Sequence, residues 1–115
     1  MNIDEKLVCI DKLSFCYNRI YYLRVLCDEQ GRAGDALRLE RRRTRLKLEL
    51  DELLVSLYQD WMGEAEALQD KLISSNEVIN RSIKDIQSQI QTAQNTTKVI
   101  GYLDDVINLA ANLIP

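Results

Sequence analysis

The stretch GRAGD, residues 31–35, holds two of the four glycines of this 115-residue chain. Glycine readily adopts the left-handed backbone conformation that ends many helices, so Gly31 is the expected cap of a preceding helix. Aspartate is a preferred first residue of a helix, so Asp35 is the expected N-cap of the next one. Because such a short connection usually joins antiparallel neighbours, GRAGD predicts a helical hairpin with its turn at residues 31–35.

Before this turn, apolar residues recur every three or four positions, which predicts one helix over about residues 3–30. The recurring set includes all three cysteines and consists of Cys9, Leu13, Cys16, Ile20, Leu23 and Cys27. At about 1.5 Å of rise per residue, the thiols are too far apart to bind one tetrahedral metal. We interpret the cysteines as packing residues, with an intermolecular disulfide or a redox thiol as the alternative.

After the turn, the pattern predicts a long helix or a helix pair over about residues 36–94. Heptad spacing runs through Leu46, Leu50, Leu53 and Leu57, and again through Trp61, Ala65, Leu68 and Leu72, with an extra step of four at Trp61. Two breaks are considered, one at Trp61–Gly63 and one at Ser74–Asn76, where Ser74 and Glu77 fit a capping box. An unbroken helix would need another chain to cover its apolar edge.

A third run of apolar residues is rich in isoleucine and carries little charge. Its members alternate steps of four and three and are Ile79, Ile83, Ile86, Ile90, Ala93, Thr97 and Ile100. This pattern predicts an amphipathic helix whose edge, at Ile79, Ile83, Ile86 and Ile90, is a candidate oligomer seam. Past Gly101 the pattern resumes, which predicts a short C-terminal helix over about residues 97–113.

The chain as a whole is predicted to be all-α, a single helical domain over residues 1–115. Its only proline is the last residue, so almost nothing interrupts a helix. The expected architecture is an antiparallel helical bundle or coiled-coil-like helical hairpin with three or four helices, in an oligomer such as a dimer or bound to a helical protein partner. The sequence predicts no transmembrane segment and no Sec signal peptide, so we expect a cytoplasmic protein or one exported without that signal.

The strongest charge feature is RLERRRTRLK, residues 38–47, with six basic residues, followed over residues 49–70 by seven acidic residues and no basic one. The arginines of a candidate basic patch are Arg38, Arg41, Arg42 and Arg45. They are interpreted as partners of acidic side chains, with contact to nucleic acid or anionic lipid as the alternative. The net charge of -3 makes nucleic acid an unlikely partner. In an antiparallel dimer, the basic block of one chain would lie beside the acidic block of another.

Nothing in the sequence predicts catalysis. The chain has no histidine, no glycine-rich phosphate loop and no CxxC pair. We therefore expect a non-enzymatic protein and predict no catalytic, metal or cofactor-binding residues.

Trp61-Met62-Gly63 resembles the W-x-G signature of the WXG100 (ESAT-6-like) family. The resemblance implies a helical hairpin of roughly a hundred residues with the tripeptide in its turn, usually dimeric, and a role in type VII secretion as an exported protein or effector partner. It also implies that Trp61 and Gly63 belong to the turn and to an interaction site. The resulting expectation is a protein–protein interaction module of the small adaptor, chaperone or export-partner kind; the alternative is a module that binds nucleic acid or lipid through residues 38–47.

Overall fold

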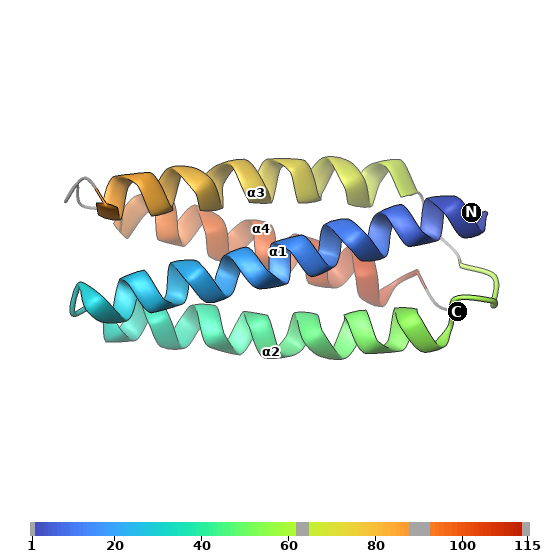
Figure 1. Cartoon of the computed structure of the whole chain (residues 1–115), viewed down its shortest axis with the longest axis horizontal. Coiled ribbons are helices and arrows are strands. Elements are labelled where there is room, and N and C mark those ends of the chain that lie inside the picture. Colours follow the sequence, from blue (N-terminus) through green and yellow to red (C-terminus); the bar gives the residue numbers. More distant parts are fainter. Residues whose placement is uncertain (1, 62–64, 88–92, 114–115) are drawn as a thin grey trace.

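The computed structural model describes residues 2–61, 65–87 and 93–113, and within these ranges it contains four helices and no strand. Helix α1 spans Ile3–Glu29, α2 Ala33–Val55, α3 Ala65–Gln87 and α4 Ala93–Ala111. Together they form an elongated bundle of 45 × 20 × 17 Å (Figure 1). The prediction of an all-α helical bundle is confirmed.

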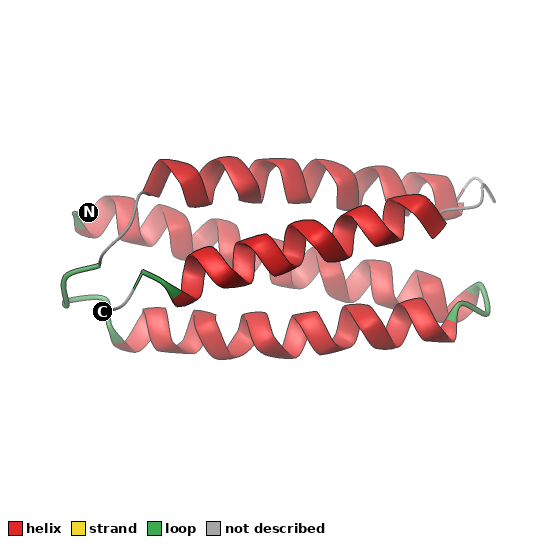
Figure 2. Cartoon of the chain, turned by 180° about the vertical axis from the view of Figure 1, so that it is seen from behind, coloured by secondary structure: helices red, strands yellow, loops and turns green. Residues whose placement is uncertain are grey.

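The bundle consists of two helical hairpins, α1–α2 and α3–α4, that lie side by side. Helix α1 packs against α2 and α3, and α4 packs against the same two helices, so α1 and α4 occupy diagonal corners, as do α2 and α3. Accordingly α1 is nearest the viewer in Figure 1 and α4 in Figure 2. Helices are antiparallel within each hairpin, whereas α1 and α3 run in the same direction, as do α2 and α4 (Figure 1). The link from α2 to α3 therefore crosses the bundle diagonally.

The first turn is as tight as GRAGD predicts, but it starts the second helix earlier. Gly31 has a φ of 74°, and the N–H of Arg32 donates to the carbonyl of Cys27 at 2.8 Å. Helix α2 begins at Ala33 with Arg32 as its N-cap, so the prediction that Asp35 is the N-cap is wrong. Asp35 instead lies in the first turn of α2, where its carboxylate is stabilised by the helix dipole and by the Arg32 guanidinium 3.0 Å away.

The two glycines of this turn are expected to respond to alanine in opposite ways. Gly31→Ala should lower the free energy of unfolding by about 1–2 kcal/mol, because alanine is strained at positive φ. Gly34 lies within α2, and a Cβ there would meet no atom within 4 Å. Gly34→Ala should therefore raise the free energy of unfolding by up to about 1 kcal/mol. Urea unfolding of both variants measures the effect; equal changes would contradict the assignment.

Of the two candidate breaks in the second half of the chain, only the one near Trp61 occurs. Helix α2 ends at Val55, a turn follows, and α3 begins at Ala65. The candidate break at Ser74–Asn76 does not occur, because α3 continues through these residues. Leu72 and Ile79 are fully buried on either side of them, so the core holds this stretch in one helix.

The isoleucine-rich run is divided between two helices. Helix α3 ends at Gln87 and α4 begins at Ala93, so Ile79 and Ile83 belong to α3, and Ile100 to α4. The prediction of one amphipathic helix through this run is therefore wrong. Helix α4 also begins four residues before the predicted start at residue 97 and ends at Ala111.

The core runs the length of the bundle and receives apolar side chains from every helix. All three cysteines point into it and are fully buried, as the spacing on the first helix predicts. The largest fully buried side chains are Leu13, Ile20, Leu23, Leu39, Leu46, Leu53, Leu68, Leu72, Ile79, Val99, Leu103 and Ile107. The core is thus continuous across both hairpins, and burial of this surface is the main stabilising term.

Three hydroxyl groups lie inside this core without a hydrogen-bond partner among the described residues, those of Ser75, Ser82 and Thr96. A buried hydroxyl without a partner costs about 1–3 kcal/mol. Ser82→Ala should therefore raise the free energy of unfolding by about 1–2 kcal/mol, measured by urea denaturation. The control Ser74→Ala, on the partly exposed side of the same helix, should gain only the difference in helix propensity, about 0.5 kcal/mol. Equal gains would show that Ser82 has a partner.

Candidate interaction surface

Exposed large apolar side chains gather on the α1–α2 hairpin. Among the described residues there are twelve: six on α1, four on α2, one in the turn after α2 and one, Ile73, on α3. Those of the hairpin and its following turn are Ile3, Leu7, Val8, Phe15, Tyr21, Tyr22, Leu37, Leu48, Leu54, Val55 and Tyr58. Single exposed apolar residues are ordinary, but their concentration on one hairpin is typical of an interaction surface.

Helix α2 has two apolar sides. The inner side carries the predicted heptad residues, of which Leu46, Leu50 and Leu53 are buried and Leu57, in the following turn, is partly buried. The outer side exposes Leu37, Leu48 and Val55, with exposed fractions of 53%, 61% and 84%. The predicted heptad comprises only the inner residues; the outer residues, which recur in the same stretch, were not predicted.

The candidate basic patch is divided between paired and unpaired arginines. Arg42 donates from Nε to Asp104 of α4 at 3.2 Å, and the guanidinium of Arg38 lies 3.6 Å from Asp35. Arg41 and Arg45 are exposed and form no ion pair within the part of the chain that the structure describes. The predicted pairing with acidic side chains thus occurs at two of the four arginines.

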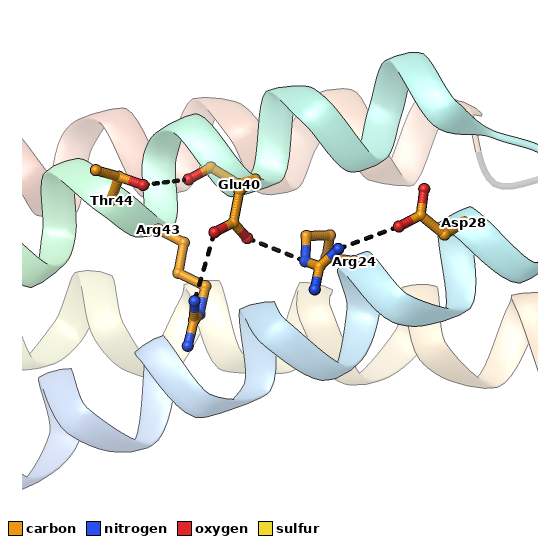
Figure 3. A network of polar contacts seen from close by, with 5 residues as sticks. All are labelled: Arg24, Asp28, Glu40, Arg43 and Thr44. Atoms are coloured by element: carbon orange, nitrogen blue, oxygen red, sulfur yellow. Dashed lines mark hydrogen bonds and ion pairs between the residues drawn. The ribbon is translucent and has the colours of Figure 1, made fainter.

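A network of arginines and aromatic rings lies on the hairpin and was not predicted. The Arg43 guanidinium lies 4.0 Å from the ring centre of Tyr17 and 4.9 Å from that of Tyr21. Glu40 bridges two cations, because its carboxylate is 3.0 Å from Arg24 and 3.5 Å from Arg43 (Figure 3). These contacts join α1 to α2 and hold part of the basic stretch against its own chain.

Two further contacts extend this network along each helix. Arg24 also donates to Asp28 at 3.1 Å, and the Thr44 hydroxyl donates to the backbone carbonyl of Glu40 at 3.0 Å (Figure 3). Arg24 is therefore shared between one carboxylate of α1 and one of α2. The sequence signal for the network was the spacing of tyrosines and arginines, which becomes informative only when the two helices are aligned.

Trp61 and Lys6 stabilise the segment that links α2 to α3 at one end of the bundle. Trp61 is 6% exposed, and its indole N–H donates to the carbonyl of Ser56 at 3.0 Å. The Lys6 ammonium is buried with it and donates to the carbonyls of Leu57 at 3.1 Å and Gln59 at 2.6 Å. It also lies 5.5 Å from the centre of the tryptophan ring. Lys6 thus provides hydrogen-bond donors for two backbone carbonyls of the link.

The turn that contains Trp61 does not close a hairpin. Helices α2 and α3, which it connects, occupy diagonal corners and do not pack against each other. Because the indole is covered by its own chain, Trp61 is a packing residue here rather than part of an exposed recognition site. Gly63, the second residue singled out with it, lies outside the described residues.

The candidate oligomer seam is also placed inside the bundle as far as it is described. Ile79 is fully buried and Ile83 is 3% exposed, both within the chain's own core. The Ile86 side chain and Ile90 lie outside what the structure describes. Heptad spacing alone does not show whether a second chain or the chain's own helices cover such an edge; here α3 packs against α1 and α4.

The buried thiols are poor nucleophiles. Burial raises the pKa of Cys16 to about 12 and that of Cys27 to about 11, the latter also through Asp35. Burial likewise raises the pKa of Cys9, against a hydrogen bond from Gln69 that lowers it. The thiols therefore stay protonated near neutral pH, and the thiolate, which is the reactive form, is scarce. This agrees with their interpretation as packing residues.

The opposite hairpin carries an open groove between α3 and α4. It has a volume of about 510 Å³ and is lined by Ser74, Glu77, Val78, Arg81, Lys98, Gly101, Tyr102 and Asp105.

No group of three or more cysteine, aspartate or glutamate side chains within the described ranges is arranged to hold a metal ion. No helix among these residues is long and apolar enough to cross a membrane. Comparisons with protein families, curated proteins and solved structures give no match to this chain.

Proposed function

We propose that this protein is a non-enzymatic protein–protein interaction module whose binding surface is the outer side of the α1–α2 hairpin. The observation that carries the proposal is the distribution of exposed large apolar side chains: of the twelve found among the described residues, eleven belong to this hairpin and the turn that follows it. The partner that fits is another helix with an apolar stripe between charged edges, since such helices bury exposed apolar residues that recur every three or four positions.

Charge supports a protein partner more than a phosphate-bearing one. Arg42 is paired with Asp104, and Arg43 is held by Glu40 and two tyrosine rings. The same helix continues into the acidic residues Asp51 and Glu52, which would repel phosphate. A surface with both charges beside apolar residues suits a protein with the complementary arrangement.

The proposal can be tested by placing a photo-crosslinking amino acid at Phe15, at Leu48 or at Glu77 in cells that express the protein. Phe15 and Leu48 are exposed on the hairpin, whereas Glu77 is a control on α3 with a side chain that is 64% exposed. Protein adducts at the first two positions and not at Glu77 would support the proposal. Equal labelling at all three positions, or none, would contradict it.

Binding of nucleic acid or anionic lipid through residues 38–47 is the alternative function. It rests on Arg41 and Arg45, which are exposed and form no ion pair in the described part of the chain. Titration with duplex nucleic acid or anionic vesicles at increasing salt distinguishes it, because affinity from phosphate contacts falls steeply with salt. Binding that is lost in an Arg41→Ala, Arg45→Ala variant would favour this alternative.

A narrower form of the proposal comes from the W-x-G resemblance and would make the partner a component or substrate of type VII secretion. Its support is the tripeptide itself, whose Trp61 lies after the end of α2 and before the start of α3. Export that depends on Trp61 is not a clean test, because the side chain is buried. Gly63→Ala, with folding checked by circular dichroism, is the sharper variant, and unchanged export in a host with this system would contradict it.

A further inference from the structure

The outer side of α2 carries a stripe of exposed residues at heptad spacing, of which Leu37, Leu48 and Val55 are apolar. The stripe steps alternately by four and three residues through Leu37, Arg41, Thr44, Leu48, Asp51 and Val55. All six residues are exposed. We call these residues the outer ridge of α2. Apolar residues that share one side of a helix at heptad positions can pack against one other helix.

The charges on this ridge and beside it change sign along the helix. Arg38, Arg41 and Arg45 lie in the first half, and Asp51 and Glu52 in the second. Arg41, Arg45 and Glu52 form no ion pair within the described ranges. Two such helices repel each other when parallel, because like charges meet, and attract when antiparallel. One helix therefore contains both halves of a complementary surface.

We infer that a second copy of the chain docks antiparallel on the outer ridge of α2, with Leu48 near the two-fold axis. This inference deepens the proposed function and rests on it, since it names the partner. If Leu48 packs on Thr44 of the second copy, the same register sets Arg41 against Asp51 and Leu37 against Val55. Two-fold symmetry makes each of these contacts twice.

The residues at the centre of this register can be buried at little cost. The Thr44 hydroxyl already donates to the Glu40 carbonyl at 3.0 Å, so covering it with Leu48 leaves no donor without a partner. Asp51 is paired with Lys47 at 2.6 Å on the surface, and Arg41 of the second copy would join that pair. Leu48, 61% exposed in the single chain, would lose this exposed apolar surface at the centre of the contact.

Sedimentation equilibrium of the full chain tests the inference, and the expected result is a dimer. Leu48→Glu should raise the dimer dissociation constant by more than about 30-fold, because it places two carboxylates at the centre of the apolar contact. Ile73→Glu is the matched control, since Ile73 is 48% exposed on α3, and it should leave the constant unchanged. Circular dichroism verifies that both variants fold. A monomeric wild type, or equal weakening by both changes, would overturn the inference.

A charge exchange tests the antiparallel register itself. Arg41→Asp and Asp51→Arg should each weaken the dimer about tenfold or more, because each opposes like charges twice. The double variant R41D/D51R should return the constant to within about threefold of the wild type. A double variant as weak as the singles would contradict this register. If the wild type is monomeric but Phe15 and Leu48 still crosslink to other proteins, the self-association fails while the proposed function stands; absence of both effects would remove both.

Discussion

Replacing Trp61 with alanine is expected to lower the free energy of unfolding by about 3–5 kcal/mol, the usual cost of deleting a buried tryptophan. The indole is 6% exposed and covers the end of the bundle where the link from α2 to α3 crosses the diagonal. It also donates its N–H to the Ser56 carbonyl, which accepts from the Gln59 N–H as well, so truncation removes one of two hydrogen bonds to this carbonyl and leaves a cavity. Urea unfolding followed by far-UV circular dichroism measures the loss.

Two further variants separate the contribution of the buried indole from that of the turn. Tyr58→Ala alters an aromatic residue of the same turn that is 85% exposed, and it should change stability by less than about 0.5 kcal/mol. Trp61→Phe keeps an apolar ring but removes the N–H, and should cost roughly 1–2 kcal/mol. If Tyr58→Ala were as costly as Trp61→Ala, the turn as a whole, rather than the buried indole, would be what stabilises this end.

Lys6→Met is expected to cost about 2–4 kcal/mol, because hydrogen bonds from a charged donor contribute about 1.5–3 kcal/mol and two partly buried carbonyls would lose theirs. Methionine retains the length and apolar character of the lysine stem, so the change reports mainly on the ammonium group. That group bonds the Leu57 and Gln59 carbonyls, both in the crossing link.

Lys12→Met provides the comparison for this variant. Lys12 lies on α1 as well but is partly exposed, so its replacement should alter stability by less than about 0.5 kcal/mol. A double variant of Lys6 and Trp61 should cost less than the two single changes together, since both residues hold the same turn. Strict additivity would show that they act independently.

The helices could largely be predicted because their signals are local. Gly31 marks the first turn, and the spacing of apolar residues before it defines α1 to within a residue or two. The extra step at Trp61 correctly signalled a change between α2 and α3. In each case the deciding interaction lies within a few residues along the chain, so the sequence alone contains it.

The errors arose where tertiary packing overrides local preference. Ser74 and Glu77 have the spacing of a capping box, yet Ser75 between them is fully buried and the helix continues. The spacing of Ile79 and Ile83 was right for a buried edge, but the sequence did not reveal that α4 of the same chain would cover it. Heptad spacing indicates that the apolar side of a helix must be covered, but it does not indicate which helix covers it.

The candidate site was predicted in composition but not in arrangement. The charge reversal along α2 was visible from residues 38–70, whereas its exposed ridge required knowing which side of the helix packs on α1 and α4. Likewise the sequence gives no sign that Lys6 would meet Trp61, since 55 positions separate them and the contact depends on the crossing link.

The diagonal link also governs the order in which the molecule should assemble. The turn at Gly31 closes α1 on α2 over a very short loop, whereas α1 meets α3 only across about 60 positions, as between Arg19 and Asn80. Short loops close at low entropic cost, so the α1–α2 hairpin should form early and its docking on α3 should limit the rate. Asn80→Ala should then slow refolding, because it removes a contact between α1 and α3 that forms during docking. Gly31→Ala should also slow refolding, because it makes the early α1–α2 hairpin less stable. Kinetic refolding experiments measure both effects.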